Sequence, residues 1–84
     1  MSKFTLSPID GRKPFYGKAI VKSIGNRLVL QSYDTDVVEY DKDTNTFRRL
    51  WSGYSATTMR HVNSFVAYCG ECGGGKKWWD ALAM

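Results

Sequence analysis

Two cysteines and one histidine have the types and spacing of a metal site. Cys69 and Cys72 form a C-x-x-C turn, and His61 stands eight residues before Cys69. Such a turn lets two thiolates converge on one ion, and zinc is held in proteins by Cys and His ligands. We therefore predict that Cys69, Cys72 and His61 are candidate zinc ligands. A carboxylate, a water molecule or a neighbouring chain would supply the fourth ligand.

The same three residues have simpler interpretations. Cys69 is expected to be a small core residue and Cys72 an incidental one. His61 then lies at the edge of the core and bonds a sheet carbonyl or Tyr68 through its ring. A redox role needs a βαβ context that the pattern does not predict, and a Cys–His nucleophile pair lacks an identifiable orienting residue.

A second group of residues combines positive charge with large aromatic rings. Arginine and tryptophan are the residues most enriched in binding hot spots, and a tandem Trp pair after glycines is difficult to bury whole. The alternative is that both tryptophans complete a small core. The candidate partner contacts are Arg48, Arg49, Lys76, Lys77, Trp78 and Trp79.

The hydrophobic pattern predicts an α+β fold in which a four-stranded antiparallel β-meander packs against one main helix. Residues 1–14 contain both prolines and are expected to form an irregular arm. Residues 15–51 carry β-forming runs separated by polar turns, of which Gly25-Asn26 is a two-residue hairpin signal. The expected strands are 15–24, 27–33, 37–40 and 46–51.

From residue 55 the period of the hydrophobic residues changes to three or four, which predicts the main helix over 55–69. Ser55 is a suitable N-cap residue, and Gly70 is expected to end the helix. Three glycines then form a flexible joint, and residues 76–84 are a tail with a short helix or turn that carries Trp78 and Trp79. The helix is expected to lie over one face of the sheet.

Length and charge restrict the function classes. A chain of 84 residues allows a single domain, 1–84, and twelve Lys and Arg against eight Asp and Glu give a net charge of +4. This charge favours an acidic protein surface or a nucleic-acid backbone as partner. No signal peptide and no stretch of roughly 20 apolar residues is found, so we expect a cytoplasmic protein with reduced cysteines and no membrane partner.

The chain resembles a family of small uncharacterised proteins carried by phages and mobile elements of Gram-positive bacteria. The resemblance is carried by QSYDTDVVEY at 31–40 and WSGYSATTMRHVNSF at 51–65. The second segment contains the helical pattern S-x-T-T-x-x-H-x-x-x-F, and the similarity extends over about 20–70 without the C-x-x-C or the tandem Trp. In that pattern, the hydroxyls of Thr57 and Thr58 would tie the first helical turn to the sheet edge.

The resemblance implies a biological setting. Small basic proteins encoded by such elements often inhibit host defence, and anti-CRISPR proteins are among them. We therefore expect a non-enzymatic inhibitor that binds a host defence protein in the host cytosol, such as a CRISPR effector nuclease. A basic inhibitor is not a nucleic-acid mimic, so it would dock on an acidic or mixed protein surface and hinder DNA loading or activation. The alternative is a small nucleic-acid-binding accessory protein that uses sheet aromatics and Arg.

Overall fold

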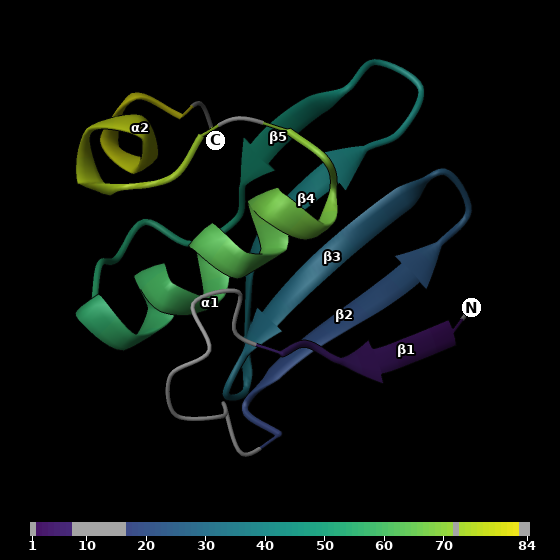
Figure 1. The fold of residues 1–84 in the computed structure, drawn as a ribbon, viewed down its shortest axis with the longest axis horizontal. Coiled ribbons are helices and arrows are strands. Elements are labelled where there is room, and N and C mark those ends of the chain that lie inside the picture. The colour runs from purple at the N-terminus through teal and green to yellow at the C-terminus, as the bar shows by residue number, and fades with distance from the viewer. Residues whose placement is uncertain (1, 8–16, 72, 83–84) are drawn as a thin grey trace.

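The computed structural model describes residues 2–7, 17–71 and 73–82, and these form a sheet covered on one face by helices (Figure 1). The described elements are β1 (Ser2–Thr5), β2 (Ala19–Ile24), β3 (Arg27–Ser32), β4 (Thr35–Asp41), β5 (Thr46–Arg49), α1 (Ala56–Tyr68) and α2 (Lys76–Ala81). None of the helices in these ranges has the length and apolar character needed to cross a membrane.

The sheet is an antiparallel meander with the strand order β1-β2-β3-β4-β5. The predicted α+β class and antiparallel sheet are confirmed, but the described strands number five and not four. The irregular arm predicted over 1–14 is wrong for Ser2–Thr5, which pairs with β2 from Ser23 to Ile20. Four residues are too few to show a strand period, and β1 is defined by the backbone hydrogen bonds that its neighbour provides. Residues 8–14 of the predicted arm lie outside the described residues.

Turn residues fix the register of the central strands. Gly25 has a φ of 59°, which suits the predicted Gly-Asn hairpin between β2 and β3. The next turn is shifted from the predicted Asp34-Thr35-Asp36, because Tyr33 adopts a φ of 56° and β4 begins at Thr35. A β-bulge between β3 and β4 then leaves Val37 unpaired, and both Val37 and Val38 are buried.

The core lies between the sheet and α1. Val21, Leu30 and Val38 stand side by side on neighbouring strands and are each 0% exposed. Helix α1 places Val62 and Phe65 against them, and these two side chains are also 0% exposed. The predicted hydrophobic stripe of the main helix is therefore the stripe that forms the core.

Both ends of α1 are formed by the residues that the sequence predicts. The Ser55 hydroxyl accepts a hydrogen bond from the Thr58 N–H at 3.0 Å, as expected of an N-cap. At the other end Gly70 has a φ of 77°, and the Glu71 N–H donates to the Val66 carbonyl at 3.2 Å. A left-handed glycine of this kind ends many helices, because it has no Cβ to clash with the preceding turn.

The glycine segment after α1 is held in place. The Gly75 N–H donates to the Asn63 side-chain oxygen at 3.0 Å, and a Cβ on Gly74 would meet the same oxygen at 2.5 Å. A Cβ on Gly73 would lie 2.6 Å from Nε1 of Trp78. These contacts place the start of α2 against α1, and the predicted flexible joint is a closely packed connection.

Candidate functional site

His61 lies inside the fold at the boundary between α1 and the sheet. Its side chain is 1% exposed, and its Nδ1 is 2.8 Å from the Ser32 hydroxyl on β3. Burial, and secondarily the positive charge of Arg60, lowers the pKa of His61. The histidine is thus bonded to the sheet, as the simpler interpretation expects, and the contact at its Nδ1 is with a hydroxyl.

Cys69 ends α1 and is partly buried against the core. Burial, and secondarily the charge of Glu71, raises the pKa of this thiol to about 12. Zinc ligation requires a thiolate, so binding of the ion would have to displace the proton of this thiol. Among the described residues no group of three His, Cys, Asp or Glu side chains could hold a metal ion. Cys72 lies outside those residues, so the zinc site of His61, Cys69 and Cys72 stays a prediction.

A cluster of buried hydroxyls connects α1 to β3, and sequence reasoning identified only part of it. The Ser32 hydroxyl lies 3.2 Å from the Thr58 hydroxyl and 2.8 Å from His61 Nδ1, and all three residues are buried. Thr58 therefore ties the first helical turn to the sheet as predicted, whereas Thr57 is exposed. Ser32 is within the resembling segment, but only pairing of β3 with the helix reveals its role.

Arg49 and Trp79, two of the predicted partner contacts, bind each other inside the fold. Arg49 projects from the covered face of β5, and its guanidinium lies 4.3 Å from the centroid of the Trp79 ring. It donates to the carbonyls of Trp51, Ser52 and Trp79 at 2.8 to 2.9 Å. Trp79 is 0% exposed, and its indole N–H donates to the Gly53 carbonyl at 2.9 Å. Trp79 is therefore buried and Arg49 half-buried, and a partner contact of Arg49 stays a prediction.

Of the other four predicted contacts, Arg48 is on β5 and three are consecutive residues of α2. Arg48 extends from the open face of the sheet, with its side chain 64% exposed and 3.9 Å from Glu39. Lys76 and Lys77 are exposed on α2. Trp78 is half-buried and packs edge-on against Phe47, with 5.5 Å between ring centroids. The six residues are therefore not one continuous site.

A first cleft, which we call the tyrosine cleft, opens where β3, β4 and the segment before α1 meet. Tyr33 and Tyr54 are about half exposed at its edge, and Trp51 forms part of its wall. Its volume is about 230 Å³, and Ser32 and Thr58 also line it. The Lys76 ammonium lies 5.4 Å from the centroid of the Tyr54 ring, which brings a predicted contact to this cleft.

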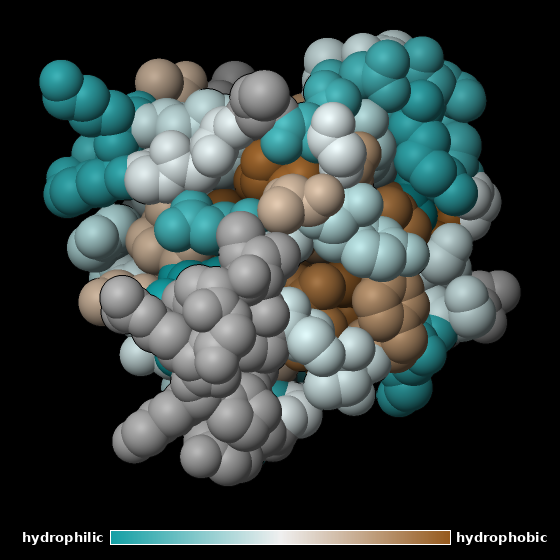
Figure 2. Space-filling view, viewed as in Figure 1, coloured by the Kyte–Doolittle hydropathy of each residue, from teal (hydrophilic) through white to brown (hydrophobic). Residues whose placement is uncertain are grey.

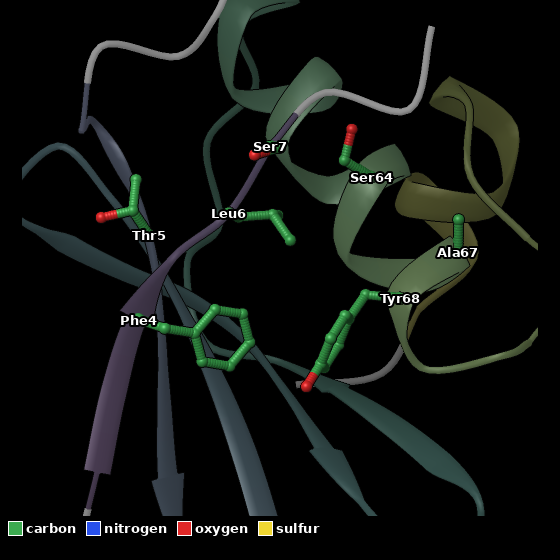
Figure 3. Close-up of a pocket in the computed structure, with 7 residues that line it drawn as sticks. All are labelled: Phe4, Thr5, Leu6, Ser7, Ser64, Ala67 and Tyr68. Atoms are coloured by element: carbon green, nitrogen blue, oxygen red, sulfur yellow. The ribbon is translucent and has the colours of Figure 1, made fainter.

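A second cleft lies between the edge strand β1 and helix α1 (Figure 3). Phe4 and Tyr68 face each other across it with 5.1 Å between ring centroids, and they are 37% and 53% exposed. Leu6 points from the strand toward the helix, and Ser64 and Ala67 form the helical wall. The volume of this β1–α1 cleft is about 350 Å³. Neither cleft was predicted, because each combines residues far apart in the chain.

The open face of the sheet has a different character. Lys22 and Asp36 are 2.6 Å apart, and Glu39 lies 3.9 Å from both Arg27 and Arg48. The pairing register places no aromatic side chain on this face within the described strands. The sheet therefore lacks the aromatic platform on which single-stranded nucleic acid stacks.

Hydrophobic and hydrophilic residues are separated on the molecular surface. Figure 2 shows hydrophobic colouring in the recess between the helices and the sheet, and hydrophilic colouring over the β4–β5 turn and the outer side of α2. The exposed large hydrophobic residues among those described are Phe4, Ile24, Tyr33, Tyr54 and Tyr68. Four of the five are aromatic and border the two clefts, so the clefts are where a partner would bury the most apolar area.

Comparison with known proteins gives a family and no function. No curated protein and no solved structure matches the chain. The match to a family model covers residues 4–81 and therefore includes every described element from Phe4 onward. The chain belongs to DUF8033, a family of unknown function.

Proposed function

We propose that this chain is a non-enzymatic inhibitor that binds a host defence protein in the cytosol of a bacterial host. A CRISPR effector nuclease is the specific candidate, and the inhibitor would block its DNA loading or its activation. The observation that carries the proposal is the set of exposed aromatic rings at the two clefts: Phe4, Tyr33, Tyr54 and Tyr68. Tyrosine gives a large contact area at low entropic cost, and it is enriched in binding hot spots.

The chemistry of the titratable residues also supports binding over catalysis. Cys69 has a pKa raised to about 12, which keeps its thiol protonated at neutral pH and makes it a poor nucleophile. Serine and histidine are residue types that can act as a nucleophile and its base. In this fold, however, His61 and Ser32 are 1% and 3% exposed, and their contact connects α1 to β3. Ser32 also lines the tyrosine cleft, but its side chain contacts both His61 and Thr58 and so joins the helix to the sheet.

The test is a DNA-cleavage assay with the purified protein and the CRISPR effectors of a bacterium that harbours the gene. Inhibition by the wild type supports the proposal, and a Tyr33→Ala, Tyr54→Ala double variant tests the tyrosine cleft. Thr57→Ala is a matched control, because Thr57 is exposed on the nearby first turn of α1. Full activity of every effector at a large excess of the wild-type protein would contradict the proposal.

A second candidate function is a small nucleic-acid-binding accessory protein. The net charge of +4 favours it, as does the exposure of Lys77 and Arg48. Its contacts would be to phosphates, since the open face of the sheet offers no aromatic platform. Binding of DNA or RNA that weakens steeply as salt rises would identify this function, because bound Lys and Arg displace counterions. No gel shift at low salt would remove it.

A further inference from the structure

Strand β1 has backbone hydrogen-bonding groups that no described strand uses. In an antiparallel pair, alternate residues bond the neighbour, and the Leu6 N–H donates to the Ala19 carbonyl at 2.8 Å. Because the period is two, Phe4 also faces β2, whereas the N–H and C=O groups of Lys3 and Thr5 point away from it. β1 is an edge of the sheet, and no described strand pairs with its outer side.

The side chains of β1 give this edge two different faces. Phe4 is opposite Val21 of the core, so it lies on the face that the helices cover, next to the β1–α1 cleft. Lys3 and Thr5 lie on the open face of the sheet. A strand added to β1 would continue both faces, and its alternate side chains would enter the cleft beside Phe4 and Tyr68.

The charged residues in the described segments that form this edge are all basic. Residues 2–7 and 17–24, which include β1 and β2, contain Lys3, Lys18 and Lys22 and no acidic residue. Lys22 is paired with Asp36, whereas Lys3 has no ion pair among the described residues. An incoming strand with an acidic residue beside Lys3 would therefore gain an attractive contact, and a basic residue there would be repelled.

We propose that the partner docks by adding an extended segment to the outer side of β1, with apolar residues in the β1–α1 cleft and acidic residues on the open face. This inference rests on the proposed function, for which it names the docking surface and the sequence pattern of the partner. The backbone bonds to Lys3 and Thr5 give affinity, and the cleft with the Lys3 ammonium selects alternating apolar and acidic residues.

A second copy of the chain is a poorer occupant of this edge than an acidic segment. Pairing β1 with β1 of another copy would bring two basic edges together, and lysine on an edge strand opposes such self-association. The charge pattern therefore favours a partner of opposite charge.

The first experiment uses peptides of about eight residues, the length of an ordinary strand. In the first peptide, glutamate alternates with valine and phenylalanine. The second has lysine in place of glutamate. The third has the same residues as the first, but its glutamates are grouped together and its apolar residues are grouped together. Amide NMR of the full chain should show shifts at Lys3, Thr5, Ala67 and Tyr68 with the first peptide. The other two should bind at least about tenfold more weakly, which corresponds to about 1.4 kcal/mol.

Two outcomes of this titration overturn the proposal. One is the absence of shifts at these amides under saturating peptide, or shifts confined to the tyrosine cleft. The other is a dependence of the β1 amide shifts on protein concentration without peptide, which would show that a second copy occupies the edge. Equal affinity for the glutamate and lysine peptides would overturn the assigned charge preference.

Variants then separate docking from folding. Thr5→Pro removes an outward N–H and leaves the bonds to β2, since proline is tolerated at such edge positions. It should weaken the glutamate peptide at least about tenfold, whereas Thr5→Val keeps the N–H and should stay within about twofold. Lys3→Glu changes an exposed side chain and should reverse the peptide preference, which tests the docking even if Thr5→Pro disturbs β1.

The same variants distinguish failure of this inference from failure of the proposed function. If the wild type and folded Thr5→Pro inhibit an effector equally, the docking surface is wrong and the inhibitor function stands. If the glutamate peptide binds at β1 but the wild type inhibits no effector, the docking surface stands and the proposed function is wrong.

Discussion

The guanidinium of Arg49 lies over the indole ring of Trp79, 4.3 Å from the ring centroid. The two residues are 30 positions apart, and they connect the end of β5 to α2. The arginine also donates to three backbone carbonyls between Trp51 and Gly53, which leave β5 and lead to α1. One side chain thus holds the tail and the β5–α1 connection together.

Replacement of Arg49 by Ala should lower the free energy of unfolding by about 2–4 kcal/mol, because several carbonyls and the Trp79 ring lose their partner. Arg49→Lys should recover little of this, since an ammonium cannot span carbonyls in several directions. Arg48→Ala is the matched control, and it should change stability by less than about 0.5 kcal/mol, since Arg48 is exposed and Glu39 keeps Arg27 at 3.9 Å. Urea unfolding followed by Trp fluorescence gives all three values. Equal losses at both arginines would contradict the assignment.

The contrast between these neighbouring arginines shows what the sequence could and could not predict. Alternation along a strand correctly placed one of them on a solvent-facing side, but the pattern did not tell which. Which arginine faces solvent depends on which face of β5 the helices cover, and on the packing of Trp79 of α2 against that face. An arginine and a tryptophan that bind each other look the same in the sequence as an arginine and a tryptophan that bind a partner.

Ser32→Ala should destabilise the fold by about 1–3 kcal/mol, because it removes a hydroxyl that His61 and Thr58 both contact in a buried site. Thr58→Ala should have a smaller effect, because it removes one of these contacts. Thr57→Ala should have almost none, since Thr57 is exposed one position away. Thermal unfolding of the three variants measures the order. A destabilisation at Thr57 as large as that at Ser32 would contradict the hydroxyl cluster as the source of the loss.

The stability of the fold should fall as the pH falls through the ordinary pKa of histidine. Burial, then Arg60, lowers the pKa of His61 in the folded state, so between that value and about 6.5 the unfolded state binds more protons. The stabilisation is complete above about pH 6.5 and is lost below it. Urea midpoints from pH 8 to pH 5 measure the loss. His61 is the only histidine, so a His61→Gln variant should lose this slope.

The clefts differ from the main elements in how far the sequence specifies them. The period of Met59, Val62 and Val66 predicts α1 by itself, and Gly25 predicts the β2–β3 turn. The β1–α1 cleft instead depends on β1, whose four residues show no period and gain their conformation from β2. The paired rings of Phe4 and Tyr68 come from opposite ends of the chain, so no local pattern relates them.

Protein purified without a histidine tag should contain almost no zinc. The described members of the predicted set, His61 and Cys69, are respectively bonded to Ser32 and held as a neutral thiol. Elemental analysis measures the ratio of metal to chain. A ratio near one that falls in a Cys72→Ser variant would instead establish the predicted zinc site. Stability that falls on chelation would then show that metal binding contributes to folding.

Cys69 should react slowly with alkylating reagents while the protein is folded. Burial, then Glu71, raises the pKa of its thiol from 9.0 to about 12, so the folded state holds far less thiolate at pH 8. The greater nucleophilicity of a high-pKa thiolate recovers part of this loss, which leaves a reaction at least about thirtyfold slower than in the unfolded chain. A Cys72→Ser variant isolates the Cys69 signal, and mass spectrometry with iodoacetamide in buffer and in urea gives both rates. Equal rates would mean that the end of α1 opens readily, and the packing of Cys69 against the core would then contribute little to the stability of the helix.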